Sequence, residues 1–194
     1  MSFDLMILLC LGVLTLFGTI DGVLIWFGFT RIEACFFIVA SFCMSRFTLS
    51  PIQEISLNLG SITVVFLLSK RSKLLYEIPR KTFVVVILSL LYGGALRAFG
   101  TTSTILPSSV IIGALSSLCQ KDKSSALFIS SIIPLIGLML SELLCLVFNG
   151  FCELNTQKSS ILTVQLLSIC TCALIGWITK SVQNTALIKS KNAH

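Results

Sequence analysis

The chain has 194 residues, of which 55% are hydrophobic and only 11% are charged, and its formal net charge is +6. A soluble domain carries about 25% charged residues, so this composition excludes a soluble globular protein. The positive charge does not indicate nucleic-acid binding, because the basic residues lie at the ends of apolar runs, as they do in membrane proteins. We therefore expect an all-α, polytopic transmembrane bundle in the plasma (cytoplasmic) membrane, with the lipid bilayer as its main partner.

Seven apolar runs follow one another along the chain, and each is a candidate crossing at about 20 residues per helix. The runs are Phe3–Phe27, Ile32–Leu49, Pro51–Ser69, Thr82–Phe99, Ile105–Cys119, Ala126–Phe148 and Ile161–Thr179. The second run has an uninterrupted core of only 12 residues, Ala34–Ser45, and either spans the bilayer or re-enters on the same side. The prediction is about seven helices, with six possible.

Positive charge predicts the orientation of these helices. If all runs cross and the N-terminus lies outside, 11 of the 14 basic residues fall on the cytoplasmic side. Three remain outside, namely Arg46, Arg97 and Lys158. This bias follows the positive-inside rule and predicts an N-out, C-in topology. Residues 1–180 are then one transmembrane domain, and residues 181–194 form a basic cytoplasmic tail.

Asp21 is the first acidic residue inside an apolar run, in the stretch FGTIDGVLIWFG. Two roles are open for it: a buried site residue, or an interfacial acid close to Arg31. Its place near the inner end of the run favours the interfacial role.

The stretch SPIQEISLNLGSITVVFLLSK predicts a helix that begins at Pro51. Ser50 before the proline, with Gln53 three residues after the serine, has the pattern of a capping box with proline at the first helical position. Glu54 would then lie in the first turn, where the helix dipole favours a carboxylate.

Asn58 lies further inside the same run. On a helix, Glu54, Asn58 and Ser61 follow the spacing i, i+4, i+7 and share one face. A polar stripe does not face lipid, so we expect it to face the bundle interior, where Asn58 either bonds between helices or binds a ligand.

Glu142 lies well inside the sixth run, where a carboxylate costs roughly 2.5 kcal/mol or more. Pro134, two turns earlier, is expected to kink this helix. Arg97, at the outer end of the fourth run, either reaches the headgroups or bends inward to neutralise Glu142 or Glu54. Together with Glu54, Asn58 and Arg46, the residues Glu142 and Arg97 predict a polar site in the outer half of the membrane.

Small residues recur every four positions in the two remaining runs. They are Ser109, Gly113 and Ser117 in the fifth run, and Ser168, Cys172 and Gly176 in the seventh. We expect them to allow close packing between helices.

No catalytic or metal-binding motif is present. The sequence has no GxSxG, Walker A, HExxH or CxxC pattern, its single histidine is His194, and seven of its eight cysteines lie in or at the ends of apolar runs. We therefore expect no enzyme activity, cofactor or metal. The one enzymatic alternative is a proton shared between the carboxylates of Asp21 and Glu142.

The segments NLGSITVV, LPSSVIIGALSSLC and SSALFISSIIPLIGLMLSELLCL resemble in layout a prokaryotic multi-pass membrane family known as domain of unknown function 1614. The resemblance covers residues 27–147 and implies that Asn58, Pro107 and Glu142 occupy family positions. The chain departs from the family pattern, in which the acid is an aspartate beside glycine and alanine. The resemblance implies the membrane architecture and no activity.

Two functional classes follow from these observations. The first is transport or permeation of a small solute or ion through the outer-half polar site, with Glu142 as the proton- or cation-linked group and Asn58 as a ligand. The second is a non-catalytic membrane subunit or scaffold, which binds a membrane protein partner or a second copy of itself.

Overall fold

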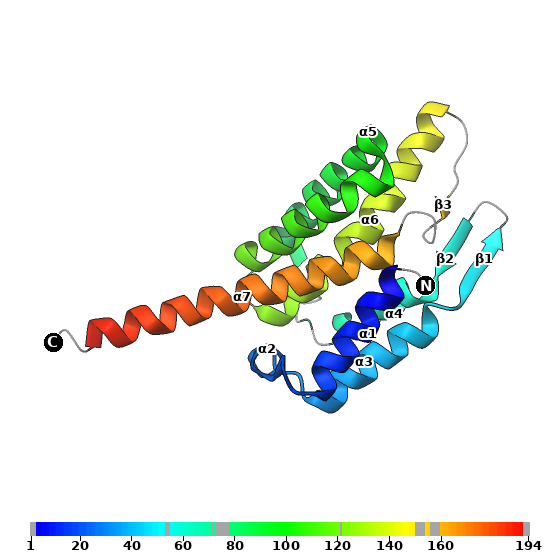
Figure 1. Cartoon of the computed structure of the whole chain (residues 1–194). Coiled ribbons are helices and arrows are strands. Elements are labelled where there is room, and N and C mark those ends of the chain that lie inside the picture. The colour runs from blue at the N-terminus through cyan, green and yellow to red at the C-terminus, as the bar shows by residue number, and fades with distance from the viewer. Residues whose placement is uncertain are drawn as a thin grey trace.

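The structure is a computed structural model, and it describes residues 3–52, 55–70, 72, 78–120, 122–149, 154–155 and 160–191. This part of the chain is helical apart from one small sheet (Figure 1). The helices are α1 (Phe3–Leu16), α2 (Asp21–Trp26), α3 (Arg31–Met44), α4 (Leu59–Ser69), α5 (Ile78–Cys119), α6 (Lys123–Asn149) and α7 (Ile161–Lys191). The strands are β1 (Thr48–Ile52), β2 (Ile55–Asn58) and β3 (Leu154–Asn155).

The sequence predicts one long helix for the first apolar run, and the structure shows two short helices instead. Helix α1 ends at Leu16, and after a turn the six-residue helix α2 begins at Asp21. Gly18 makes this break, because its φ of +71° is a left-handed conformation that side chains rarely adopt. A Cβ at Gly18 would also lie 2.5 Å from Nη2 of Arg31. The backbone conformation of the turn therefore favours glycine, and a Cβ there would also displace the end of the Arg31 side chain.

The prediction that a helix begins at Pro51 is also wrong. Residues Thr48–Ile52 form β1, which pairs antiparallel with β2, and the helix begins only at Leu59. Proline is tolerated in β1 because this strand lies at the edge of the three-stranded sheet. Asn58 is the residue before the helix, and its side chain is not part of a polar helical stripe. Glu54 lies outside the described residues.

The C-terminal half consists of longer helices. Helix α5 contains two helical arms that meet at a bend (Figure 1), where Gly100 has a φ of 76° and a ψ of 170°. The two arms correspond to the fourth and fifth apolar runs. Helix α7 continues past Thr179 to Lys191, and its C-terminal end extends away from the other helices (Figure 1).

Three helices in the described part of the chain are long and apolar enough to cross a membrane. They are Phe83–Gly100, Lys123–Phe148 and Ile161–Gln183. Large apolar side chains on the outside support the same conclusion: Phe83 is 69% exposed, Phe99 71% and Phe148 80%. Such surfaces face lipid rather than water, so the chain is a membrane protein.

The interior is unusually rich in hydroxyl groups. Among the described residues, every buried polar side chain is uncharged, and most are serine or threonine. Small side chains let helices approach closely in membranes, where burial of apolar surface does not drive helices together. The predicted close approach is seen at Gly113, where a Cβ would lie 2.5 Å from the carbonyl oxygen of Ser168 on α7.

The crossing of α5 and α6 offers a direct test of this packing. Gly93→Ala would place a Cβ 2.6 Å from the carbonyl oxygen of Gly137, whereas Gly94, the next residue, has no atom within 4 Å of its Cβ position. We expect Gly93→Ala to lower the free energy of unfolding by about 1–3 kcal/mol through overpacking. Gly94→Ala should be neutral or stabilising by about 0.5–1 kcal/mol. The measurement is the thermal unfolding midpoint in detergent, and equal midpoints for the two variants would contradict the crossing.

Candidate functional site

Arg97 and Glu142 form an ion pair between α5 and α6. Arg97 Nη2 lies 3.5 Å from Glu142 Oε2 and 3.4 Å from the carbonyl oxygen of Ser141. The side chain of Glu142 is 17% exposed and that of Arg97 is 45% exposed. Of the two positions considered for Arg97, the structure shows the inward one. The intramembrane carboxylate is thereby compensated by a charge from the neighbouring helix.

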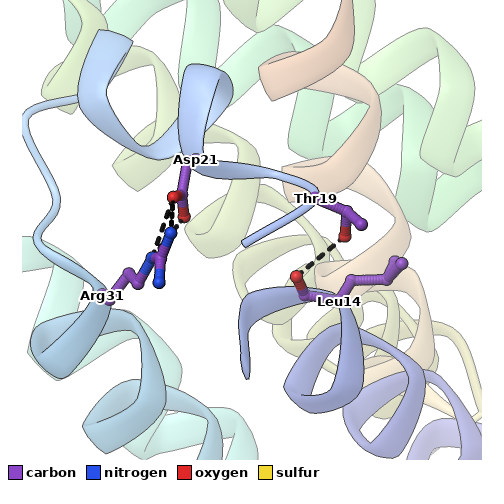
Figure 2. A network of polar contacts seen from close by, with 4 residues as sticks. All are labelled: Leu14, Thr19, Asp21 and Arg31. Carbon is purple, nitrogen blue, oxygen red and sulfur yellow. Dashed lines mark hydrogen bonds and ion pairs between the residues drawn. The ribbon is translucent and has the colours of Figure 1, made fainter. Parts of the chain in front are cut away.

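Asp21 pairs with a different arginine. Arg31 Nε donates to both carboxylate oxygens of Asp21 at 2.8 Å, and Arg31 Nη2 also contacts Asp21 Oδ2 (Figure 2). Hydrogen bonding by Arg31, helped by its charge, lowers the pKa of the exposed Asp21 carboxyl. The pair joins α2 to the start of α3, outside the three spanning helices. Asp21 thus lies beside Arg31, which its predicted interfacial role requires, and no proton-sharing contact between Asp21 and Glu142 is seen among the described residues.

Asn58 connects the end of α3 to the start of α4. Its Oδ1 accepts a hydrogen bond from the backbone N–H of Gly60 at 2.8 Å, and its Nδ2 donates to the carbonyl oxygen of Ser45 at 3.3 Å. The side chain is buried, with 5% exposure. Gly60 has no room for a side chain, because a Cβ there would lie 2.9 Å from Ser45 Cα. Asn58 is therefore the N-cap that positions α4 against α3.

Gln165 on α7 is a buried amide that the sequence analysis did not single out. It is 0% exposed, and its Nε2 donates to the carbonyl oxygen of Ser131 on α6 at 2.9 Å. The same nitrogen lies 3.4 Å from the carbonyl oxygen of Ser61 on α4. We call the meeting point of these three residues the α4–α6–α7 junction. The sequence did contain a signal for this residue, because Gln165 is a polar amide at the fifth position of the apolar run Ile161–Thr179.

Two oxygens at this junction carry no hydrogen bond in the described part of the chain: Gln165 Oε1 and Ser61 Oγ. The amide cannot rotate to exchange its ends, because Oε1 would then face the carbonyl oxygens that Nε2 now binds. Leaving a buried acceptor unsatisfied costs about 1–3 kcal/mol. Such an oxygen is suited to accept an N–H or O–H, or to coordinate a monovalent cation.

Pro134 lies on α6 and lacks a backbone N–H. The carbonyl of Ser130, four residues earlier, therefore has no helical donor from that position. Neither this carbonyl nor the junction's side chains carry a charge. The junction thus combines neutral oxygen atoms from α4, α6 and α7.

The predicted site residues that the structure describes do not gather into one site. Asn58 belongs to the α3–α4 connection, Arg97 and Glu142 belong to the α5–α6 contact, and Asp21 lies beside Arg31 on α3. Ser61 and Gln165 carry buried oxygens without a hydrogen bond in the described part of the chain. No protein-family description, curated protein or solved structure matches this chain.

The capping role of Asn58 predicts an order of stabilities. Asn58→Ala removes both hydrogen bonds and should lower the free energy of unfolding by about 1 kcal/mol or more. Asn58→Ser keeps a capping oxygen but loses the bond to Ser45, so it should lie between Asn58→Ala and the unmodified chain. Thermal unfolding in detergent measures this order, and an Asn58→Ala midpoint equal to that of the unmodified chain would contradict it.

Proposed function

We propose that the chain is a multi-pass protein of the cytoplasmic membrane with about seven crossings, N-out and C-in. In addition to the three long helices, α1, α3, α4 and the second arm of α5 would cross. At 1.5 Å per residue, the 14 residues of α3 and the 11 of α4 are about 21 and 17 Å long, shorter than the roughly 30 Å hydrocarbon core. Local thinning of the bilayer accommodates short crossings.

The bias of positive charge supports this orientation. Arg46 follows α3 and Arg97 precedes the bend at Gly100, whereas Arg31 is the first residue of α3 and Lys70 follows α4. The resemblance to domain of unknown function 1614 is in keeping with this architecture and stays a prediction.

The topology predicts which cysteines react from outside. In a cysteine-free background, Arg46→Cys should react with a membrane-impermeant thiol reagent added to intact cells. Lys180→Cys should react only after the membrane is made permeable. Both positions carry a basic residue in the native chain, so the substitutions are matched in charge. Reaction of Lys180→Cys in intact cells would contradict the C-in orientation.

For the activity, we propose transport of a small uncharged polar solute or a monovalent cation through the α4–α6–α7 junction. The observation that carries this proposal is the pair of buried oxygens without hydrogen bonds, Gln165 Oε1 and Ser61 Oγ. Ser61 lies in the first turn of the short helix α4, and Gln165 lies on the neighbouring helix α7. Broken helices whose ends meet near the middle of the bundle are typical of transporter binding sites.

The ligand class follows from the donor set. The junction offers oxygen atoms and no buried charge, so it favours a ligand that donates hydrogen bonds or a cation with a single charge. The junction is closed on all sides, since Gln165 and Ser61 are both 0% exposed. Transport would therefore require movement of α4 or α7, as in alternating access.

The second candidate is the membrane subunit or scaffold. It is favoured by the use of the predicted site residues as contacts between helices: Asn58 holds α4 and Glu142 binds Arg97. In this class the polar residues stabilise the bundle, and the protein acts through a partner in the membrane.

A flux assay separates the two candidates. The purified protein is reconstituted into liposomes, and the entry of Na⁺, K⁺ and glycerol is compared with protein-free liposomes. We expect at least one probe to enter about tenfold faster, and Gln165→Leu to abolish this increase because it removes the acceptor oxygen. Thr171→Val is the matched control, since it also removes a polar group from α7, one that bonds only to its own helix through the Leu167 carbonyl.

The outcomes of this assay are distinct. If Gln165→Leu elutes as a single species and loses flux while Thr171→Val keeps it, the transport proposal is supported. If the unmodified protein is folded and passes none of the three probes, the transport proposal is wrong as stated. Co-purification of a membrane protein in fixed stoichiometry would then support the scaffold.

A further inference from the structure

A second feature of the bundle is an apolar cavity of about 230 Å³, on the α1–α3 side of α7. Its walls come from α1, α2, α3, α4, α6 and α7 and include Leu11, Val23, Phe37, Leu68, Leu127 and Ala173. Apart from Thr15, whose hydroxyl bonds to the Leu11 carbonyl of its own helix at 2.7 Å, the lining is apolar or a thiol. The cavity therefore lacks the hydrogen-bonding groups that a polar solute would need.

The size and lining suit a hydrocarbon chain. An engineered apolar cavity of about 150 Å³ is enough to bind benzene. The cavity here is larger and partly open, and it lies in a membrane protein. A stretch of acyl chain is the apolar ligand that a bilayer supplies at high concentration.

Helix α2 covers one end of the cavity. It follows the Gly18 turn and is held to α3 by the Asp21–Arg31 pair (Figure 2). The position that a Cβ of Gly22 would take lies 3.8 Å from Nε1 of Trp177, so α2 also reaches α7. Trp177 is 40% exposed, and tryptophan is enriched at the boundary between hydrocarbon and headgroups.

Basic side chains lie at the same end of the bundle. The charge of Lys180 acts on Lys123 as a like charge, and the carboxylate of Asp122 acts on Lys123 with the opposite sign. Lys123 lies one helical turn before the cavity residue Leu127, and Lys180 lies three residues beyond Trp177. Asp122 beside them caps α6 by accepting from the N–H of Ser125 at 2.9 Å. Two neighbouring ammonium groups next to an apolar cavity form the two halves of an amphiphile site.

We propose that this cavity holds an acyl chain of an anionic phospholipid, whose phosphate lies between Lys123 and Lys180 with Trp177 at the boundary. The site is separate from the α4–α6–α7 junction. It rests on the membrane location of the chain and not on the proposed transport. Helix α2 is held to α3 by the Asp21–Arg31 pair, and it forms the wall between the bound acyl chain and the aqueous side of the membrane.

Trp177 provides a direct probe of this lipid. The protein has two tryptophans, so Trp26→Phe leaves Trp177 as the single one. This variant is reconstituted into phosphatidylcholine bilayers that contain a small fraction of lipid with brominated acyl chains, which quench nearby tryptophan. We expect brominated phosphatidylglycerol to quench Trp177 at least threefold more strongly than brominated phosphatidylcholine at the same fraction.

Charge variants test the headgroup contact. Lys180→Gln should remove most of the preference for phosphatidylglycerol, whereas Arg46→Gln, which removes the same charge after α3, should retain it. An equal preference in both variants would overturn the assignment of Lys180. Equal quenching by the two brominated lipids in the parent variant would overturn the anionic lipid altogether.

Filling the cavity tests the acyl chain. Ala173→Phe should reduce the quenching by phosphatidylglycerol, and Ala173→Met provides a smaller change if the phenylalanine prevents folding. If both fold and the preference is unchanged, the phosphate binds without the chain and the cavity assignment is wrong. If inorganic phosphate at about 50 mM abolishes the preference, the lysines bind the free anion and the lipid proposal is overturned.

Discussion

The constraint on which the rest of this structure depends is that hydrocarbon offers no hydrogen bonds. A polar group at membrane depth is therefore stabilised by a partner within the chain, and it costs free energy where it has none. The hydroxyls of Ser108, Ser168 and Thr171 donate hydrogen bonds to carbonyl oxygens of their own helices. Apolar side chains are left to cover the outside. The result is a bundle that exposes large apolar side chains on its surface and buries many serine hydroxyls among its apolar core residues.

The same constraint explains how the chain can break its helices. Each break needs partners for the backbone groups that a helix end leaves open. Helix α3 begins with a capping box, in which the N–H of Thr30 donates to Glu33 Oε2 at 2.8 Å and the N–H of Glu33 donates to Thr30 Oγ1 at 3.3 Å. Helix α4 begins with Asn58, and the strands between these helices satisfy one another by pairing. Short helices are stable here because their ends are closed by named side chains.

The sequence predicted the membrane class because composition and apolar runs report directly on lipid exposure. It also pointed to Glu142 and Arg97, since charged residues in so apolar a chain are few. The prediction of a helix was wrong between Ser50 and Asn58, where the pattern of serine, proline and glutamine suits either the start of a helix or an edge strand. The choice is made by the contact of Asn58 with Ser45, 13 residues away, and by pairing with β3. Gln165 was overlooked for a related reason, since its partners are backbone carbonyls that no residue pattern reveals.

Helix α7 links the two candidate binding regions. Its buried segment Ile161–Leu166 carries Gln165 to the junction with α4 and α6, and its next turns carry Cys170, Ala173 and Leu174 to the apolar cavity. Gln165 and Ala173 are eight residues apart, about 12 Å along a helix. Because a helix is stiff over this length, a shift of α7 that changes the cavity also moves the amide at the junction. The Gln165 amide cannot exchange its two ends, so such a shift would change its bonds to Ser61 and Ser131 together. The two regions are therefore mechanically connected through one rigid element.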